Sequence, residues 1–528
     1  MLFISKRTIS LLLSLVILIT CANIGVNATD SENVTIIKTV EQLNAIRNNI
    51  DENGKIYGNY RLGADIVFNE GETFSPIGCS SSGGVSAAFI GEFDGDGYTI
   101  KNITLKSNAT SHSTLYLGLF SSNNGTIKNL IMENANMVVT KCNYLSAGSI
   151  AGTMYSSDGR GKILNCFVKG EISLQNPSVA VYTRMGGIVG TVTSGATVNK
   201  VLSNVNIKYE SKNSESIMLG GIAGENGGKI FGCGNNGNID ALSKNGVYAG
   251  GIAGCIVGTA SVIQDCFNTA KIKAESDMSM CLGGIAGSIG EASGITTKIL
   301  YNCNAGKISP KANFSGGAFT SQMASIASGA IIGSFKGESR DNYYLEDTYS
   351  VASTKGQINA SEVTVEEMRN ASLDKISTWY LPSDNNSIPQ LQAWKNIQQF
   401  DVDFTREIDK LYRTVDINTH LLAQAIYDDG TSETIGRATV THLPFAFGEN
   451  TASISWRGES DEVTFNGYYA GDTDFNTVVS VTDIICSLEA VTSEKDIGIG
   501  IVAADVDKNS VLNVTDIVIA RKMILEND

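Results

Sequence analysis

Gly220-Gly221-Ile222-Ala223-Gly224 and Gly250-Gly251-Ile252-Ala253-Gly254 are two copies of one five-residue block. Similar blocks begin at Gly148, Gly186 and Gly283, and successive first glycines are 38, 34, 30 and 33 residues apart. A unit that recurs at such a period indicates a solenoid, in which each repeat forms one coil and packs on its neighbours. These glycine blocks therefore decide the fold class.

A second motif lies between the glycine blocks. Aligning its copies places small apolar residues in one column: Cys166, Val201, Cys233, Cys266 and Cys303. Coils of a parallel β-helix stack about 4.8 Å apart, so like side chains lie on like. Because Val201 interrupts the cysteines, we interpret the column as an interior ladder of small hydrophobic residues and not as a metal site. The sequence therefore predicts a parallel β-helix.

The blocks resemble the GLUG repeats of bacterial surface and secreted proteins. Ala64–Ile66 and Phe93–Ile100 resemble the usual beginning of that β-helix. A short helical stretch at Val365–Met368, then Trp379 and Ile388–Leu391, resembles its end. The resemblance implies a GLUG-type β-helix over residues 32–395. It says little about activity, because one fold supports many functions.

The alignment also allows a search for catalytic side chains on the coils. Glycosidases typically use two carboxyl groups that face each other across the substrate. One outward column contains a single carboxylate: Ser173, Lys208, Asp240, Lys273 and Ser309. A second column also contains one: Asn165, Lys200, Gly232, Asp265 and Asn302. No catalytic residue is predicted, and a glycoside hydrolase or polysaccharide lyase stays the alternative because loops of unequal length could assemble a site.

The composition excludes some classes of function. The chain has 528 residues, which suggests roughly three or four domains, and its net charge is −15. Such an acidic chain is not expected to bind nucleic acid, which requires a basic surface. Three histidines argue against a histidine-based zinc site. The 55 glycines and 6 prolines favour a β-rich chain with many turns.

The first 28 residues resemble a signal peptide. Lys6 and Arg7 precede the apolar run Ile9–Ile19, and Val26-Asn27-Ala28 offers a cleavage site of small residues. Such a run is too short to span a bilayer, and no later stretch is long and apolar enough. We therefore expect a secreted, extracellular protein without a membrane span, associated with a scaffold or a cell surface through a partner.

Residues 402–469 lack the glycine blocks and contain strand-length apolar segments instead. The stretch Tyr427–Thr431, read as Tyr-Asp-Asp-Gly-Thr, predicts a turn between two strands, with further segments at Arg437–Leu443 and Thr451–Trp456. This region resembles the small bacterial immunoglobulin-like domains that separate modules of secreted proteins. The resemblance implies a small β-sandwich, and an irregular linker with some β structure is the alternative.

Residues 471–528 contain one twelve-residue pattern twice, 33 residues apart. Oxygen-bearing side chains occupy loop positions 1, 3, 5, 9 and 12, and position 7 offers a backbone carbonyl. The first copy consists of Asp472, Asp474, Asn476, Val478, Ser480 and Asp483, and the second of Asp505, Asp507, Asn509, Val511, Asn513 and Asp516. This spacing lets a short loop surround a calcium ion with hard oxygen ligands. The pattern therefore predicts two Ca²⁺ ions, and the apolar run after each loop predicts a short helix.

The duplicated pattern resembles a type I dockerin, the EF-hand-like α-helical module that binds the cohesin modules of a cellulosome scaffoldin. The resemblance implies a recognition pair at loop positions 10 and 11. The two pairs here are identical, which implies that either half could face the cohesin. The predicted cohesin-binding residues are Val481, Thr482, Leu488, Val514, Thr515, Arg521 and Lys522. Thr477 and Ser510 stand at position 6, where the sharp turn favours glycine, so we expect weaker calcium binding than the family norm.

Together these patterns predict a mainly β chain: a parallel β-helix, a small β-sandwich and a C-terminal dockerin. The functional hypothesis is a secreted component of a cellulosome-type assembly, docked on a scaffoldin through calcium. Its β-helix would serve adhesion or glycan binding during polysaccharide breakdown, with a polysaccharide or a cell surface as its partner.

Overall fold

The structure is a computed structural model. It describes residues 34–80, 85, 87–106, 114–139, 142–156, 159–175, 179–211, 216–289, 297–312, 326–368, 379–380, 390–391, 397–404, 411–412, 421–428, 430–435, 439–442, 448–456, 459–468, 471–473, 479–493, 503–507 and 511–526. The predicted signal peptide lies outside these residues.

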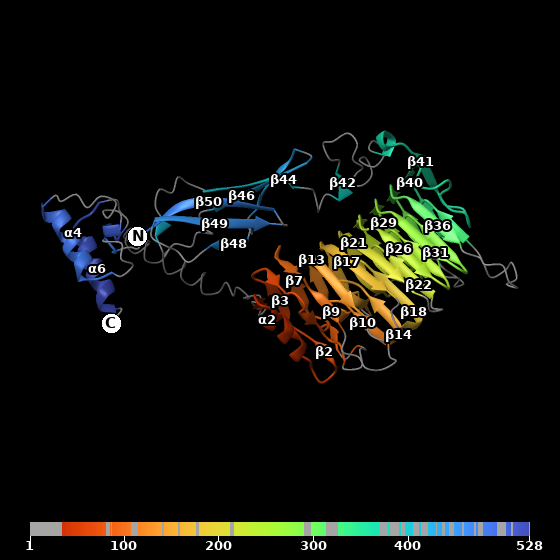
Figure 1. Ribbon diagram of the computed structural model, residues 1–528, viewed down its shortest axis with the longest axis horizontal. Coiled ribbons are helices and arrows are strands. Elements are labelled where there is room, and N and C mark those ends of the chain that lie inside the picture. Colours follow the sequence, from red (N-terminus) through yellow and green to blue (C-terminus); the bar gives the residue numbers. More distant parts are fainter. Residues whose placement is uncertain are drawn as a thin grey trace, which may run out of the picture.

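The N-terminal two thirds of the chain form a parallel β-helix, as predicted, and Figure 1 shows its coils stacked from β3 to β36. Each complete coil contributes strands to four parallel sheets, here numbered 1 to 4 in chain order. Sheet 1 consists of β1 (Val34–Ile37), β3 (Asn59–Leu62), β7 (Glu92–Asp94), β12 (Thr126–Lys128), β16 (Lys162–Leu164), β20 (Thr197–Asn199), β24 (Lys229–Phe231), β29 (Val262–Gln264), β34 (Lys298–Leu300) and β39 (Glu338–Arg340).

Sheet 2 has one continuous path of strands and several accessory strands. The path is β4 (Ile66–Val67), β8 (Thr99–Lys101), β13 (Ile131–Val138), β17 (Phe167–Gln175), β21 (Leu202–Glu210), β25 (Gly234–Asn235), β30 (Phe267–Asn268), β35 (Cys303–Asn304), β40 (Asn342–Leu345) and β41 (Ala360–Val363). The accessory strands are β5 (Thr73–Phe74), β9 (Thr104–Lys106), β26 (Ile239–Ser243), β31 (Ile272–Ser276) and β36 (Ile308–Ala312).

Sheets 3 and 4 are joined by the glycine blocks. Sheet 3 consists of β10 (Thr114–Leu117), β14 (Cys142–Ala147), β18 (Val179–Gly186), β22 (Ser216–Gly220), β27 (Val247–Gly250), β32 (Met280–Gly283) and β37 (Ile326–Gly329). Sheet 4 consists of β2 (Lys55–Ile56), β6 (Ala88–Phe89), β11 (Phe120–Asn123), β15 (Ala151–Met154), β19 (Val189–Val192), β23 (Ala223–Asn226), β28 (Ala253–Ile256), β33 (Ala286–Ile289) and β38 (Ile332–Ser334).

The glycine block makes the sharp corner between sheets 3 and 4. In the coil that contains Gly251, the isoleucine of the block, Ile252, is buried in the core. A Cβ atom on Gly251 would lie 2.1 Å from the carbonyl oxygen of Gly284 in the next coil and 2.2 Å from Cγ of Asn268. Real Cβ contacts are not this short, so the close approach of coils at the corner requires glycine there.

The cysteine column is confirmed for four of its five predicted members. Strand register places these four residues next to one another along the helix axis: Cys166, Val201, Cys233 and Cys266. All four are buried, and burial raises the pKa of the Cys166 thiol to about 12. The column is therefore an inert hydrophobic ladder, as interpreted from the sequence.

The placement of Cys303 in this column was wrong. Cys303 pairs with Phe267, the residue after Cys266, so Asn302 occupies the column position. The placement of Asn302 in the column of Asp265 was therefore wrong as well, because Tyr301 is the residue opposite Asp265. The register follows Ile308, which pairs with Ile272 and lies six residues after Asn302. Because strand register fixes which face a side chain occupies, a shift by one residue moves Cys303 to the outside of the coil. Its Sγ atom there lies 3.0 Å from Sδ of Met368.

A ladder of buried asparagines runs beside the cysteine column and was not predicted. Asn235 donates from Nδ2 to Oδ1 of Asn268 at 2.9 Å, and Asn268 donates to Oδ1 of Asn304 at 2.8 Å. Each side chain also holds its own turn: Oδ1 of Asn235, for example, accepts the backbone N–H of Gly237 at 3.2 Å. Because each amide is buried with partners, the ladder fixes the register of three coils.

A short helix covers the first coil. Helix α2 (Val40–Ala45) and the 3₁₀ helix η1 (Ile46–Asn48) bury Leu43 and Ile46 against the open end of the core. Thr39 is the N-cap, and its hydroxyl accepts the backbone N–H of Gln42 at 3.3 Å. This amphipathic segment removes the exposed apolar end that a stack of coils would otherwise have.

The segments predicted to end the β-helix form a capped helical turn and a strand pair. Residues 365–368 are helical, and Thr364 and Glu367 hydrogen-bond each other's backbone N–H groups as a capping box. Strand β42 (Trp379–Tyr380) pairs with β43 (Gln390–Leu391).

Two small sheets follow. One contains β44 (Ile397–Phe404), β46 (Leu421–Tyr427) and β47 (Ser432–Ile435), and the other β45 (Leu411–Tyr412), β50 (Glu459–Tyr468), β49 (Gly448–Trp456) and β48 (Thr439–His442). Gly430 adopts φ +79° in the turn before β47, where the Tyr-Asp-Asp-Gly-Thr stretch was predicted to turn. The immunoglobulin-like assignment and the boundaries 402–469 stay predictions.

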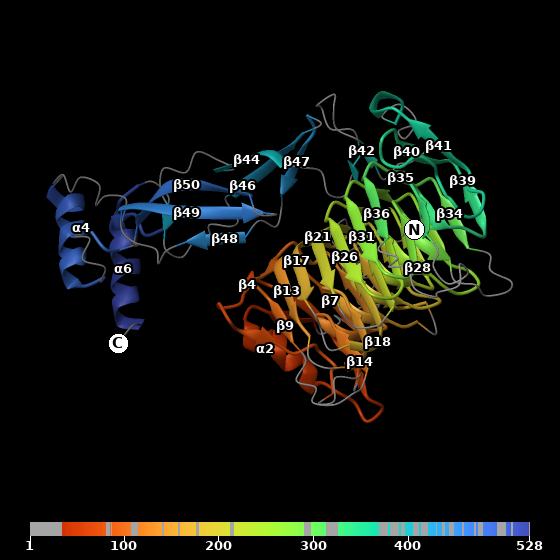
Figure 2. The ribbon, with the colours of Figure 1, turned by 45° about the vertical axis from the view of Figure 1, so that its right-hand side comes forward.

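Helices α4 (Val481–Ser493) and α6 (Val514–Glu526) pack against each other at the C-terminal end, and Figure 2 shows them side by side. Each begins at position 10 of a predicted loop, so the twofold sequence pattern is also a structural one. No helix within the described part of the chain is long and apolar enough to cross a membrane.

Candidate metal centre

Both C-terminal helices begin with the same cap. Ser480 and Asn513, at loop position 9, precede α4 and α6, and their side-chain oxygens accept the N–H groups of Thr482 (3.2 Å) and Thr515 (2.8 Å). A serine or asparagine that accepts a hydrogen bond from the first helical turn is a favourable N-cap. Position 9 of each loop therefore has a helix-capping role, whether or not it contacts a metal ion.

The aspartate at loop position 12 links the two ends of each loop. The Asp483 carboxylate accepts the backbone N–H of Ser480 at 2.8 Å and that of Thr473 at 2.7 Å. The Asp516 carboxylate accepts the N–H of Asn513 at 2.9 Å and that of Asp507 at 3.1 Å. Both carboxylates are buried, and an ionised buried group requires such partners. Each loop is thereby closed on the first turn of its helix.

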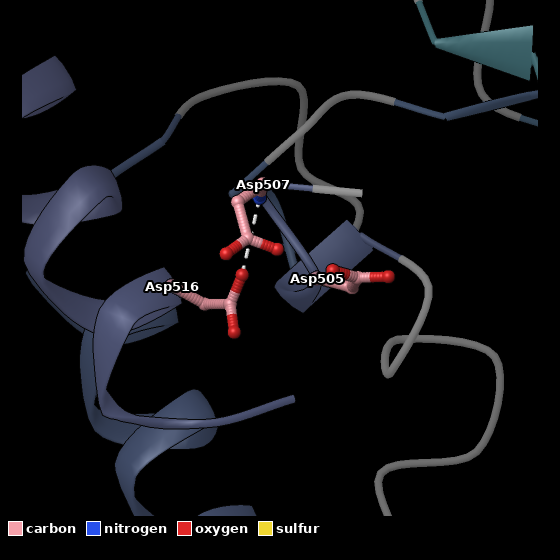
Figure 3. A group of neighbouring side chains, drawn as sticks. All are labelled: Asp505, Asp507 and Asp516. Atoms are coloured by element: carbon pink, nitrogen blue, oxygen red, sulfur yellow. Dashed lines mark hydrogen bonds between the residues drawn. The ribbon is translucent and has the colours of Figure 1, made fainter. Parts of the chain in front are cut away.

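Three carboxylates of the second loop converge. Asp505, Asp507 and Asp516, at loop positions 1, 3 and 12, each offer an oxygen, and these oxygens lie within 4.8 Å of one another. Figure 3 shows that Asp516 comes from the first turn of α6, while Asp505 and Asp507 come from the preceding loop segment. Asp505 and Asp516 are buried and Asp507 is exposed.

This cluster fits a hard divalent cation. Like charges at such a separation repel one another, and a cation among them removes the repulsion. Carboxylate oxygens are the ligands that calcium and magnesium prefer. The spacing at positions 1, 3 and 12 predicted this set of residues, and the structure brings the three together at a site that could hold a metal ion.

The first loop is described only at its ends. Asp472 and Asp483 are buried there, as are their counterparts in the second loop. The predicted ligands Asp474, Asn476 and Val478, and Asn509 of the second loop, lie outside the described residues. The two loops meet where the backbone N–H of Gly471 donates to the carbonyl of Ala503 at 2.7 Å.

Position 7 of the second loop has an internal partner. The carbonyl of Val511, predicted as a ligand, accepts a hydrogen bond from Nδ2 of Asn513 at 3.0 Å. A carbonyl oxygen has two lone pairs, so this bond leaves capacity for a second interaction.

The predicted cohesin-binding residues lie on exposed helix surface. Val481 and Val514 are 63% and 62% exposed, and Thr482, Leu488, Thr515, Arg521 and Lys522 are exposed as well. Sequence reasoning missed Ile485 and Val518, which are 50% and 61% exposed. They lie four residues after Val481 and Val514 and thus on the same helix face, and that i, i+4 spacing was the signal available in the sequence.

The two helices show the same pattern of burial from loop position 10 onward. Residues 481–488 and 514–521 alternate between exposed and covered positions in the same order. Apolar side chains on the exposed row are unusual for a surface helix, which normally directs them to the core. Each helix therefore leaves apolar side chains of this row exposed.

No protein-family model matches this chain. Halomucin from Haloquadratum walsbyi is 32% identical over 165 residues, which covers 30% of this chain and 2% of halomucin. A solved structure described as a putative immunoglobulin A1 protease from Bacteroides ovatus is 19% identical, with a TM-score of 0.41, and the match covers 68% of this chain and 92% of that one. The chain spans a very small part of the curated relative that it matches.

The outward side chains of the coils bear on the alternative of a glycosidase, which needs two carboxyl groups facing the substrate. The predicted outward column is confirmed by the register of Ser173, Lys208, Asp240, Lys273 and Ser309. Asp240 lies between two lysines and contacts one of them, with 3.7 Å between its Oδ1 and Nζ of Lys273. This column therefore places lysines, and not a second carboxylate, beside Asp240.

A second charged group lies near the start of the β-helix. Nζ of Lys128 is 2.6 Å from Glu92 and 3.6 Å from Asp94. Oδ1 of Asp94 also accepts hydrogen bonds from the backbone N–H of Asp96 and from Nδ2 of Asn129. This carboxylate therefore holds the turn at residues 94–97, Asp-Gly-Asp-Gly. These contacts join two neighbouring coils. A pocket of about 360 Å³ lies beside α2, and none of these residues lines it.

Proposed function

We propose that the C-terminal module is a calcium-dependent docking module of the type I dockerin kind. It would hold this secreted chain on a cohesin-bearing scaffold and present the β-helix to a polysaccharide or a cell surface. The observation that carries the proposal is the convergence of loop positions 1, 3 and 12 next to an exposed apolar row that recurs on both helices.

The residues of the chain suggest how binding of an ion would be coupled to docking. Asp505, Asp507 and Asp516 would hold an ion in the second loop, and Asp472 and Asp483 belong to the equivalent positions of the first. Bound calcium supplies positive charge that compensates these carboxylates and fixes the loop. Because position 12 lies in the first helical turn, ordering the loop also orients the residues at positions 10 and 11. Metal binding and folding of such a module are linked.

The exposed rows explain how a partner would be recognised. Val481, Ile485 and Leu488 follow one another along one face of α4, and burying such side chains against a partner favours association. On α6 the row is Val514, Val518 and Arg521, so it ends in a charge. The shared valine and threonine at the start of each row support a common mode of docking, in which either helix can face the same cohesin.

The experiment is to place aspartate at the start of each row, alone and together. Val481→Asp or Val514→Asp alone is expected to change binding to immobilised type I cohesins by no more than about twofold, because the other helix remains. The double variant is expected to lose more than about 100-fold, since a charge in each apolar patch must be desolvated on docking.

Surface plasmon resonance in calcium, with Ser493→Asp at the far end of α4 as the matched exposed control, measures these affinities. Equal binding by the double variant and the unmodified chain would contradict the proposed docking surface. Circular dichroism of each variant in calcium checks that the helices still form.

A further inference from the structure

Sheet 3 carries tyrosines on its outward face. Two rows of side chains run along the helix axis, and the side chains in them point away from the core. The first row is Thr114, Tyr144, Tyr182 and Ser216, and the second is Tyr116, Ser146, Arg184, Met218 and Tyr248. We call these two rows the tyrosine face. Because parallel register places equivalent positions of successive coils side by side, rings from separate coils form one continuous surface.

The central rings of this face are exposed and already ordered. Tyr144 is 37% exposed and Tyr182 is 38% exposed, and the two rings stack with their centroids 6.0 Å apart and an interplanar angle of 20°. The guanidinium carbon of Arg184 lies 5.8 Å from the Tyr182 ring centroid. Exposed tyrosines that are held rigidly lose little entropy on binding, which is why tyrosine is favoured at recognition surfaces.

Sheet 4 adjoins the tyrosine face. The outward row of that sheet is Ser122, Thr153, Thr191 and Glu225. Two contacts join it to the tyrosine face: Oγ of Ser146 lies 2.9 Å from Oγ1 of Thr191, and Nε of Arg184 lies 2.8 Å from a carboxylate oxygen of Glu225. Thr153, Thr191 and Arg184 are partly exposed, so hydroxyl and guanidinium groups flank the aromatic surface.

The tyrosine face is close to neutral on a strongly acidic chain. The net charge of the whole sequence is −15, and sheet 1 carries charged pairs such as Lys298 and Glu338, 2.8 Å apart. In the rows that form the tyrosine face and its neighbour on sheet 4, the described charges are Arg184 and Glu225, which neutralise each other. A surface without net charge complements an uncharged partner and gives no electrostatic attraction to an ionic one.

We propose that the tyrosine face binds a neutral polysaccharide that runs along the helix axis. The C–H faces of pyranose rings would stack on Tyr144 and Tyr182. The sugar hydroxyls would exchange hydrogen bonds with the tyrosine, threonine and arginine groups beside them. This inference rests on the proposed function in that it names the ligand class of the β-helix, and it uses no residue of the C-terminal module.

The test is affinity electrophoresis of the full-length chain in gels containing xyloglucan, glucomannan or polygalacturonate, with binding to microcrystalline cellulose measured by sedimentation. We expect retardation by at least one neutral polymer and none by polygalacturonate, which carries the same sign of charge as the chain. Tyr144→Ala with Tyr182→Ala is expected to weaken binding roughly 30-fold, because each truncated aromatic contact typically costs about five- to sixfold.

Tyr155→Ala is the matched control, since Tyr155 is exposed but lies outside the two rows, and it is expected to bind as the unmodified chain does. Tyr144→Phe with Tyr182→Phe keeps the rings and should retain most of the affinity. Failure to bind any of the neutral polymers, or full binding by the double alanine variant, would overturn the proposal.

Sedimentation velocity covers the remaining outcome: a dimer that the double alanine variant abolishes would make the face an interface between copies and would also overturn the proposal. Measuring the cohesin binding of the same variants distinguishes failure of this inference from failure of the proposed docking function. A double alanine variant that still docks in calcium but loses polysaccharide supports the inference. Loss of cohesin binding alone concerns only the C-terminal module.

Discussion

Alanine at both Asp472 and Asp505 is expected to abolish calcium-dependent docking. These residues occupy position 1 of the two loops and are buried at the points where the loops begin. Removing the first carboxylate lowers the ligand charge of each loop, and the affinity for calcium is expected to fall by more than about 100-fold. The loops then no longer order the first turns of α4 and α6, and the exposed rows lose their fixed orientation.

Calcium-dependent capture by an immobilised type I cohesin measures this effect. Asp277→Ala, which removes an exposed carboxylate from the β-helix, is the matched control and is expected to bind as before. Either single variant retains one intact loop and is expected to show intermediate binding. Undiminished capture of the double variant, or capture of the unmodified chain in EDTA, would show that docking does not depend on these aspartates.

Gly251→Ala is expected to destabilise the β-helix strongly. The new methyl group would meet the backbone of Gly284 and the buried amide of Asn268 at distances that require the coils to move apart. Overpacking of a close-packed interior typically costs 1–3 kcal/mol, and here disruption of the asparagine ladder adds to it, so we expect a loss of about 3 kcal/mol or more.

Gly246→Ala is the matched control in the same coil. Its Cβ would approach side-chain atoms of Ser279 and Tyr248 at 3.2 Å, a contact that small rotations relieve, so a loss below about 1 kcal/mol is expected. Differential scanning calorimetry separates the β-helix transition from those of the other modules. This account of the corner would be contradicted if Gly251→Ala lowered the β-helix transition temperature by less than 1 °C, or by no more than Gly246→Ala lowers it.

The coil architecture was predictable because its constraints repeat along the chain. Every coil must pass the same corner, so glycine recurs there, and every interior position must accept its equivalent above and below. The error at Cys303 shows the limit of aligning by residue type. Cysteine matched the column, but the pairing of Ile308 with Ile272 sets the register and makes Asn302 the correct member.

The features that sequence reasoning missed depend on contacts between coils. Asn235, Asn268 and Asn304 share an offset from the column residue of their own coils, yet that offset alone does not distinguish a buried ladder from surface turns. Only the burial of these asparagines in the structure shows that they form an interior ladder. Tyr144 and Tyr182 lie in segments of unequal length, and only strand register places one on the other.

The candidate metal centre was predictable in composition but not in geometry. The spacing of Asp505, Asp507 and Asp516 indicated calcium ligands, because an EF-hand-like loop sets which positions face inward. The spacing did not reveal that Asp483 and Asp516 also accept backbone hydrogen bonds that close each loop on its helix. These bonds give position 12 a structural role besides that of a ligand.

Isothermal titration of the metal-free full-length chain with calcium tests the central claim most directly. The account predicts two ions per chain, with binding lost when Asp472 and Asp505 are both alanine. Failure to bind calcium at millimolar concentrations, or the same two-ion titration from the double variant, would contradict it.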